Sequence, residues 1–100
     1  MVLVHLCQRS QWEHAISTGE YRPSSLEREG FIHCSFPEQI QRVAQCFYRD
    51  VPELILLWID PQRVLPEIRW ESADGETFPH IYGPLNLEAV ISVQDYDGGA

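Results

Sequence analysis

The sequence predicts a single α+β domain with two helices in its N-terminal half and a mainly antiparallel, split sheet. Two observations predict this class. One hundred residues, 44% of them apolar, match the length and core content of one ordinary domain. The hydrophobic period alternates twice between strand and helix and then stays strand-like over four segments. We expect residues 1–95 to form the domain and residues 96–100 to be a frayed tail.

The first strand and helix are expected close to the N-terminus. Residues 2–7 are rich in β-formers and predict a strand. Ser10 is interpreted as a helix N-cap, with Glu13 completing a capping box, and Gly19 ends this helix. Residues 21–30 contain Pro, Ser and Gly, so we expect a connecting loop there.

A second strand and helix follow, and then the strongest strand of the chain. Residues 31–35 predict a short strand, and Pro37 stands in the first turn of a helix that ends near residues 50–52. The apolar stripe of this helix consists of Ile40, Val43, Ala44 and Phe47. Residues 53–60 are apolar on both faces, so we expect a central strand.

Three shorter strands complete the predicted sheet. Residues 64–70 read as a turn and an edge strand, because Pro66 lacks the N–H that a central strand needs. Residues 72–76 are a turn, residues 78–82 a further strand, and residues 87–93 the last strand, of alternating type.

The charge of the protein restricts its partners. Seven arginines and no lysine stand against fifteen acidic residues, for a formal net charge of −8. Nucleic-acid polymers bind through basic patches that release counterions, so we expect no polymer of this kind as a partner. The same field disfavours anionic membranes. A small nucleotide-like anion held by a local arginine cluster stays compatible with this charge.

Cysteine use and hydropathy indicate a cytoplasmic protein. Cys7, Cys34 and Cys46 are odd in number and show neither a disulfide framework nor a zinc-binding spacing. The N-terminus has no charged region of the kind that opens a signal peptide. The longest apolar run, residues 54–59, is far shorter than a membrane span. Nothing in the sequence specifies an oligomeric state.

Three histidines lie within apolar strand segments, and we expect these segments to meet in one polar pocket. The segments are residues 4–6, 31–35 and 78–83. Because side chains alternate along a strand, His33 and Ser35 share a face, and so do His80 and Tyr82. A desolvated imidazole needs a hydrogen-bond partner, which can be structural or functional. His5, on the first strand, is expected to face the same pocket.

The remaining residues of the two motifs are expected in the core behind the pocket. Cys34 and Ile81 alternate with the histidines and therefore point to the opposite face. Cys34 cannot pair with the adjacent His33 as a nucleophile for the same reason. The spacings between the three histidines are not those of a metal site, so no metal is expected.

The acidic residues offer one candidate for this pocket. Glu88, at the start of the last predicted strand, is the acid placed where it can reach a space between strands. Glu71 and Asp74 lie in or beside the predicted turn at residues 72–76 and are interpreted as solvated loop charges. His14, in the first helix, is interpreted as solvated as well.

Two motifs carry a resemblance to a known family over almost the whole chain. They are Gly30-Phe31-Ile32-His33-Cys34-Ser35 and Phe78-Pro79-His80-Ile81-Tyr82-Gly83-Pro84-Leu85, supported by Trp12, Gly19, Tyr21, Ser25, Leu26, Glu29, Leu57, Ile59, Asp60, Trp70 and Glu71. With these residues the chain resembles the bacterial family called domain of unknown function 952. More distantly, its layout is similar to the RNA 2′-phosphotransferases and the ADP-ribosyltransferase fold.

The distant resemblance implies an NAD-binding cleft in a split, two-sheet core. It implies that His5 hydrogen-bonds a ribose and that His33 and Ser35 correspond to a His-x-Ser motif of the cleft. His80 and Tyr82 would line the third side, with Tyr82 able to stack on a nicotinamide-like ring. Glu88 is the acid that follows this third motif, so the candidate catalytic residues are His33, His80 and Glu88, and NAD is the candidate cofactor.

Three functions are compatible with these residues. The first is a transferase-like enzyme acting on NAD or a nucleotide-like small molecule, with His33 in acid–base chemistry or in contact with a phosphate. The second is a non-catalytic module that binds such a metabolite. The third is a structural or interaction domain whose histidines satisfy one another.

Overall fold

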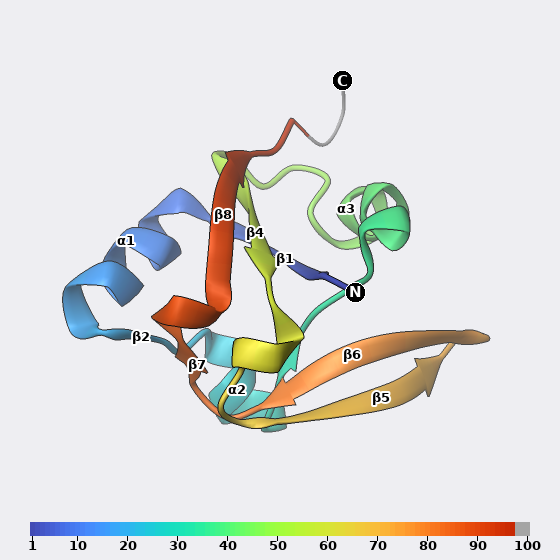
Figure 1. Cartoon of the computed structure of the whole chain (residues 1–100). Coiled ribbons are helices and arrows are strands. Elements are labelled where there is room, and N and C mark those ends of the chain that lie inside the picture. The colour runs from blue at the N-terminus through green and yellow to red at the C-terminus, as the bar shows by residue number, and fades with distance from the viewer. Residues whose placement is uncertain (98–100) are drawn as a thin grey trace.

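The computed structural model describes residues 1–97 and forms two small antiparallel sheets with helices around them (Figure 1). The first sheet has the strand order β1-β4-β8, and the second β3-β6-β5. The bounds are β1 Leu3–Gln8, β4 Leu54–Ile59, β8 Val90–Asp95, β3 Ile32–His33, β6 Glu76–Tyr82 and β5 Glu67–Ala73, with a third ladder of β2 Glu20–Tyr21 and β7 Leu85–Asn86. The predicted α+β class with antiparallel sheets is confirmed.

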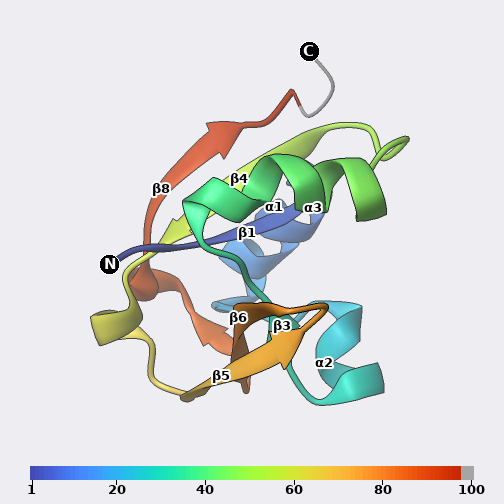
Figure 2. The ribbon, with the colours of Figure 1, turned by 90° about the vertical axis from the view of Figure 1, so that its right-hand side faces the viewer.

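Strand β4 lies in the centre of the first sheet, as its apolar sequence predicts. Its alternate residues pack into two separate core clusters, with Ile55 and Leu57 in one and Leu54 and Leu56 in the other. Helix α1 (Arg9–Thr18) covers the first face and helix α3 (Ile40–Phe47) the second, as Figures 1 and 2 show. A strand buried on both faces needs apolar residues at every position.

The second sheet is built around a long hairpin. Strands β5 and β6 are joined at Asp74 and Gly75, whose φ angles of 53° and 79° are both positive. An Asp-Gly pair with two positive φ angles is the turn that fits the twist of a two-stranded ribbon. Figure 1 shows this hairpin extending away from the first sheet. Strand β5 runs from Glu67 to Ala73, so it begins and ends three residues later than the predicted segment at residues 64–70 and includes Glu71.

The two sheets are joined where β1 passes the segment after β3. Val4 and Ser35 exchange two backbone hydrogen bonds of 2.9 Å. The side chain of His5, one residue along β1, bonds to the backbone of His33 beside them. The predicted strand at residues 31–35 is therefore two residues of β3 followed by this single bridge.

The helices differ from the predictions at their ends. Helix α1 begins after Gln8, whose backbone N–H donates to Oε1 of Gln11 (2.9 Å), so Ser10 is not the cap. Gly19 ends the helix as predicted, with a φ of 99°. The predicted loop contains a short helix, α2 (Ser24–Glu29). Pro23 and Gly30 are its N-cap and C-cap residues. Pro and Gly are common at helix ends as well as in loops, which is why a loop was predicted here.

The second predicted helix is shorter than expected. A 3₁₀ turn, η1 (Pro37–Gln39), leads into α3, which ends at Phe47 rather than near residues 50–52. Ala44 is the buried residue of α3, whereas Phe47 is 74% exposed. The apolar stripe of this helix therefore covers the sheet only in part.

The C-terminal strand also lies later in the chain than predicted. Residues 87–89 form a 3₁₀ turn, η3 (Leu87–Ala89), and β8 follows; a similar turn, η2 (Pro61–Arg63), lies after β4. Tyr96 donates its backbone N–H to the carbonyl of Leu54 (3.0 Å) and packs on the core, so this part of the predicted tail is attached to the sheet. Residues 98–100 of that tail lie outside the described residues.

Candidate functional site

A cavity of about 340 Å³ lies where the two sheets and α3 meet. All three histidine-bearing segments contribute to it, as the sequence predicts. Helix α3 and the tip of the β5–β6 hairpin complete its walls, and their side chains make the cavity more apolar than expected. The lining residues from the three segments are His5, Leu6, His33, Cys34, Ser35, Phe78 and His80.

His5 is held entirely by internal hydrogen bonds. Its Nδ1 donates to the carbonyl of His33 (2.5 Å), because a carbonyl can only accept. Its Nε2 then accepts from the hydroxyl of Tyr21 (2.8 Å). Burial lowers the pKa of His5 to about 4, which keeps the ring neutral and this tautomer in place. His5 therefore lines the cavity, but both of its ring nitrogens are bonded within the protein.

His33 and His80 stand opposite each other on β3 and β6, with ring centroids 5.3 Å apart. Each is bonded to a carboxylate. Nε2 of His33 donates to Glu29 (3.0 Å), and Nδ1 of His80 donates to Glu71 (2.7 Å). A carboxylate that orients an imidazole in this way leaves the other ring nitrogen to exchange a proton.

Glu71 binds two side chains with one oxygen. Besides His80, the hydroxyl of Tyr82 donates to its Oε1 (2.6 Å). The hydrogen bonds from Tyr82 and His80 lower the pKa of Glu71, and the same bond raises the pKa of Tyr82. The guanidinium of Arg69 lies 4.2 Å from the centroid of the Tyr82 ring. This contact brings a positive charge to the outer side of the site.

Phe31 covers the histidine pair from the solvent side. Its ring stacks on His80, with centroids 4.2 Å apart and planes at 18°, and it meets His33 edge-on at 4.7 Å. Phe31 follows Gly30, which has a positive φ of 89° and turns the chain from α2 into β3. A residue with a Cβ rarely adopts such a φ, so this glycine places the aromatic ring.

The predicted site residues separate into three groups in the structure. His33, His80 and Ser35 line the cavity, and so does His5. Tyr82 lies beside the cavity and faces Glu71. Glu88 does not reach the cavity: it lies in η3 and accepts a hydrogen bond from Asn86 (2.9 Å).

The acid that bonds both His80 and Tyr82 is Glu71, which was wrongly predicted to be a solvated loop charge. The hairpin strand continues to Ala73, so Glu71 is a strand residue, two positions from Arg69, which stands directly opposite His80. Period-2 alternation then puts Arg69 and Glu71 on the face of His80 and Tyr82. Glu71 was among the residues that carry the family resemblance, as part of Trp70-Glu71, and this could have indicated a place in the site. Asp74 also differs from the expectation, because it lines the cavity.

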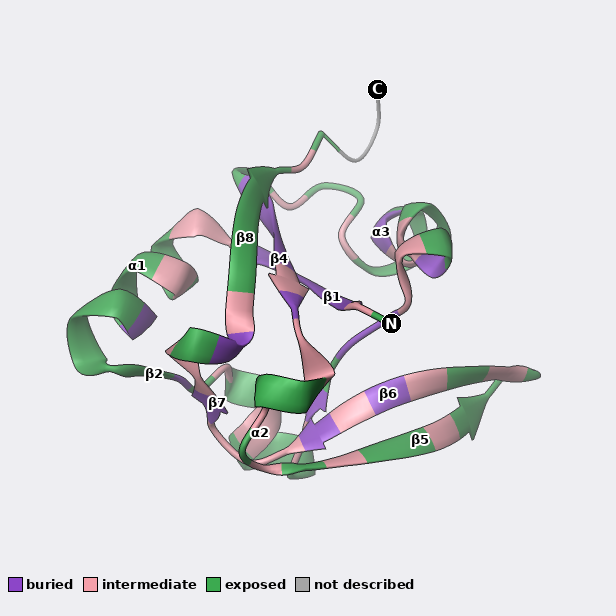
Figure 3. Ribbon diagram, in the orientation of Figure 1, coloured by how far each residue is buried: buried purple, intermediate pink, exposed green. Residues whose placement is uncertain are grey.

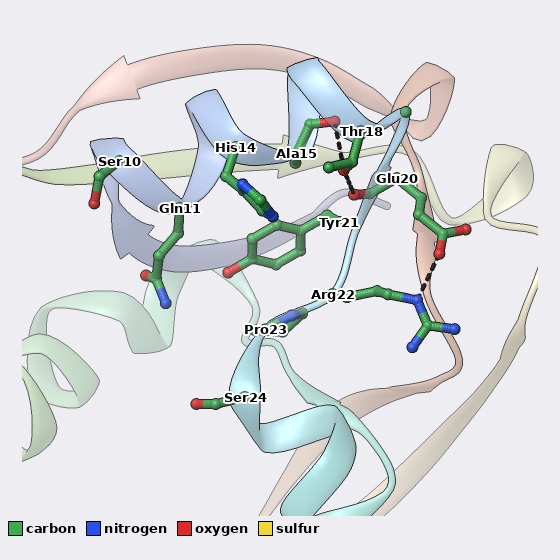
Figure 4. Close-up of a pocket in the computed structure, with 11 residues that line it drawn as sticks. Ser10, Gln11, His14, Ala15, Thr18, Glu20, Tyr21, Arg22, Pro23 and Ser24 are labelled. Carbon is green, nitrogen blue, oxygen red and sulfur yellow. Dashed lines mark hydrogen bonds and ion pairs between the residues drawn. The ribbon is translucent and has the colours of Figure 1, made fainter.

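Two other cavities contain none of the predicted site residues. One, of about 510 Å³, lies between α1 and the segment from β2 to α2 (Figure 4). Its cation, Arg22, is paired with Glu20 at 2.5 Å, and Tyr21 forms its inner wall. The other, of about 700 Å³, lies between the end of α3 and Tyr96. Neither is lined by two histidines, as the histidine cavity is.

The described residues restrict the chemistry further. Within residues 1–97 no group of three or more His, Cys, Asp and Glu side chains is placed to hold a metal ion. Burial raises the pKa of the Cys34 thiol to about 12, so this thiol is a poor nucleophile. Over the same residues, no helix combines the length and the apolar character that crossing a membrane requires. The lining residues that are bonded to carboxylates are His33 and His80.

Fold and site together define a small two-sheet α+β protein whose cavity is bordered by two histidine–carboxylate pairs. The chain belongs to the family of proteins of unknown function DUF952, whose model matches residues 6–93. No curated protein matches the sequence.

Solved structures of one bacterial protein have the same fold. The crystal structure of protein CC0527 from Caulobacter crescentus is 30% identical and superposes with a TM-score of 0.89, covering 97% of this chain and 87% of that chain. The solution NMR structure of CC0527 gives a TM-score of 0.81 at 30% identity, covering 96% and 84%. A double mutant of CC0527 with two methionine substitutions matches as well as the unmodified protein.

Proposed function

We propose that this protein is a transferase-like enzyme that acts on NAD or a nucleotide-like small molecule, with His33 and His80 as its acid–base pair. The observation that carries the proposal is the pair itself. Two imidazoles lie 5.3 Å apart at one cavity, and a carboxylate orients each of them. One neutral and one protonated histidine at this separation can remove a proton from one group and supply a proton to another.

A row of three nitrogen-bearing side chains supports a substrate with a phosphate. His33 stands opposite His80, and His80 stands opposite Arg69, across neighbouring strands of one sheet. Side chains at opposed positions lie on the same face. The guanidinium of Arg69 donates from Nη2 to Glu67 (3.2 Å) and has further N–H donors for a phosphate, and its side chain lies over the ring of Tyr82.

The resemblance to ADP-ribosyltransferases supports NAD as the first nucleotide to test. In that resemblance the cleft lies in a split, two-sheet core, and a glutamate supports the reacting centre. Glu71 meets the need for an acid, because it lies beside both His80 and Tyr82. In this proposal Glu71 is the acid at the reacting centre, the role that the resemblance implied for Glu88.

Calorimetric titration of the full chain with NAD and with ADP-ribose tests the proposal. We expect both to bind, and we expect mass spectrometry to detect nicotinamide released from NAD. His33→Ala and His80→Gln should each abolish the release; Gln at position 80 keeps a donor for Glu71. His14→Ala is the matched control, because His14 is an exposed histidine on α1.

The outcomes separate the three functions. Binding without release of nicotinamide indicates a metabolite-binding module. Absence of binding for both compounds at millimolar concentration contradicts a nucleotide function. A loss of activity in His14→Ala that equals the loss in His33→Ala would move the site to the cavity of Figure 4, which His14 lines.

A further inference from the structure

We propose that the histidine cavity binds a small organic amine, with the apolar body inside the cavity and the ammonium group on Asp74. This goes beyond the transfer proposed above, because it concerns a second ligand and holds whether or not a nucleotide binds. Three properties of the cavity support it: its apolar walls, the absence of a cation from the described residues that line it, and the position of Asp74.

The walls of the cavity suit an apolar group of modest size. Its volume of about 340 Å³ lies at the small end of the range for ligand pockets. The apolar lining residues come from helix α3, the residue that follows it, and the hairpin. These residues are Ile40, Val43, Phe47, Tyr48, Ala73 and Phe78.

The polar groups that line this cavity are the three histidines, Asp74 and the hydroxyls of Ser35 and Tyr48. One nitrogen of His33 and one of His80 are already bonded to carboxylates. His5 has no nitrogen to offer, since both are bonded internally. Among residues 1–97, those that line the cavity include no arginine, and the chain has no lysine. The charged group among the described lining residues is therefore a carboxylate, which a cationic ligand complements.

Asp74 supplies the counter-charge. It stands at the tip of the hairpin and is the acidic residue among those that line the cavity. Within the described part of the chain, no ion pair includes Asp74. The arginine that α3 brings to this tip, Arg42, pairs instead with Glu76. A protonated amine would give Asp74 a partner.

Anions and neutral compounds fit this arrangement less well than an amine. Inside the cavity an anion meets the carboxylate of Asp74 and no arginine among the described lining residues; Arg69, to which we assign the phosphate of a nucleotide, lies outside this lining. A neutral apolar compound gains only the burial of its surface. An amine gains the same burial and a charge-assisted hydrogen bond, which is the stronger kind.

The test compares 2-phenylethylamine with 2-phenylethanol, which has the same shape and no charge at neutral pH. Each is titrated into the full chain, and amide chemical shifts are followed by NMR. We expect shifts at Val43 and Ala73 with both compounds, and a roughly tenfold tighter dissociation constant for the amine, as one charge-assisted hydrogen bond provides.

Asp74→Asn is the decisive variant, with Asp50→Asn as its control. Asp74 has a positive φ of 53°, a conformation that asparagine also tolerates, so the turn is expected to persist. In Asp74→Asn the amine and the alcohol should bind with about equal dissociation constants, and the alcohol should bind as it does to the unaltered protein. Asp50 is exposed and lies outside this cavity, so Asp50→Asn makes the same change in net charge and should leave the preference intact.

Two results would overturn the inference: equal binding of amine and alcohol by the unaltered protein, or a preference that survives in Asp74→Asn. The inference would also be overturned if neither compound shifted the amide signals of the cavity residues. None of these results bears on the nucleotide, which is titrated separately with NAD and ADP-ribose. Amine binding without nucleotide binding would contradict the proposed transfer and leave this inference standing.

Discussion

The first sheet and the second sheet use histidine in opposite ways. In β1, His5 is 5% exposed, and both of its nitrogens are bonded within the protein. In β3 and β6, His33 and His80 each have one nitrogen on a carboxylate and the other available. The comparison teaches that the number of internal partners, more than residue type or strand position, decides whether a histidine is structural.

The two sheets also differ in how much of the core they carry. Strands β1 and β4 are buried along almost their whole length, whereas β5 is exposed or half-buried throughout (Figure 3). The second sheet therefore presents a polar face that holds Arg69, Glu71 and Tyr82. Reactive groups can occupy that face because the first sheet supplies most of the apolar burial.

Removal of His5 should have the largest effect on stability. His5→Ala leaves the Tyr21 hydroxyl and the His33 carbonyl without partners and opens a void, which should cost about 3–5 kcal/mol of unfolding free energy. His33→Ala, at an exposed position, is the comparison and should cost far less. Urea unfolding measures both. Equal losses in the two variants would contradict the structural role of His5.

Acidification should act through the same residue. The pKa of His5 is about 4 in the folded protein, below its ordinary value of 6.5, so the unfolded chain binds the proton more tightly. Stability is then complete above pH 6.5 and falls as the pH drops toward 4, by about 3 kcal/mol from this group.

Urea unfolding at pH 7.5 and pH 4.5 measures this dependence. The carboxyl groups of Glu29 and Glu71 have lowered pKa values, so their contribution is lost only below their ordinary value of 4.5. The two effects thus occupy different pH ranges. An unfolding free energy that stays constant between pH 6.5 and 4.5 would show that His5 is not held neutral by burial.

Gln39 should have an intermediate effect, because it ties α3 to the hairpin. Its buried amide donates to the carbonyl of Thr77 (3.0 Å) and accepts from the N–H of Phe36 (2.8 Å). Gln39→Ala should cost about 2 kcal/mol, measured by urea unfolding. Arg42→Ala removes only an exposed ion pair to Glu76 and should change the melting temperature very little. A larger effect for Arg42 than for Gln39 would reverse this assignment.

The smallest effect on stability, and the sharpest on the site, is expected for Glu71→Gln. Gln keeps an acceptor oxygen but loses the negative charge, so the hydrogen bond that raises the pKa of Tyr82 weakens and this pKa should fall toward its ordinary value of 10. Carbon-13 NMR of the Tyr82 ring measures it. Glu67→Gln, on the same strand and face, is the control and should leave most of the raised pKa of Tyr82 in place, because Glu67 pairs with Arg69. Similar changes in both variants would mean that overall charge, not this hydrogen bond, sets the pKa.

Alternation along the strands predicted much of the site. It placed Cys34 and Ile81 in the core, and both are buried. It also placed His80 and Tyr82 on one face, where Glu71 now bonds both. It failed for Glu71 because the predicted edge strand stopped at residue 70, one position before it. Hairpin length depends on cross-strand pairing with β6, which a local pattern does not contain.

Other elements were misjudged because local signals have two meanings. Pro23 and Gly30 predicted a loop, yet they cap α2, the helix that carries Glu29 to His33. Glu88 was expected near the cavity because it follows the third motif. The 3₁₀ turn at residues 87–89 instead directs it to Asn86.

The sequence by itself determined the class of the fold, the central position of β4 and the three segments that meet at the cavity, because hydrophobic period and side-chain alternation are local properties of the chain. The tertiary structure decided which histidine is structural, which acid serves the pair and that Asp74 faces the cavity. These depend on the distances between side chains that are far apart in the sequence. Only the packing of the two sheets against α3 sets those distances.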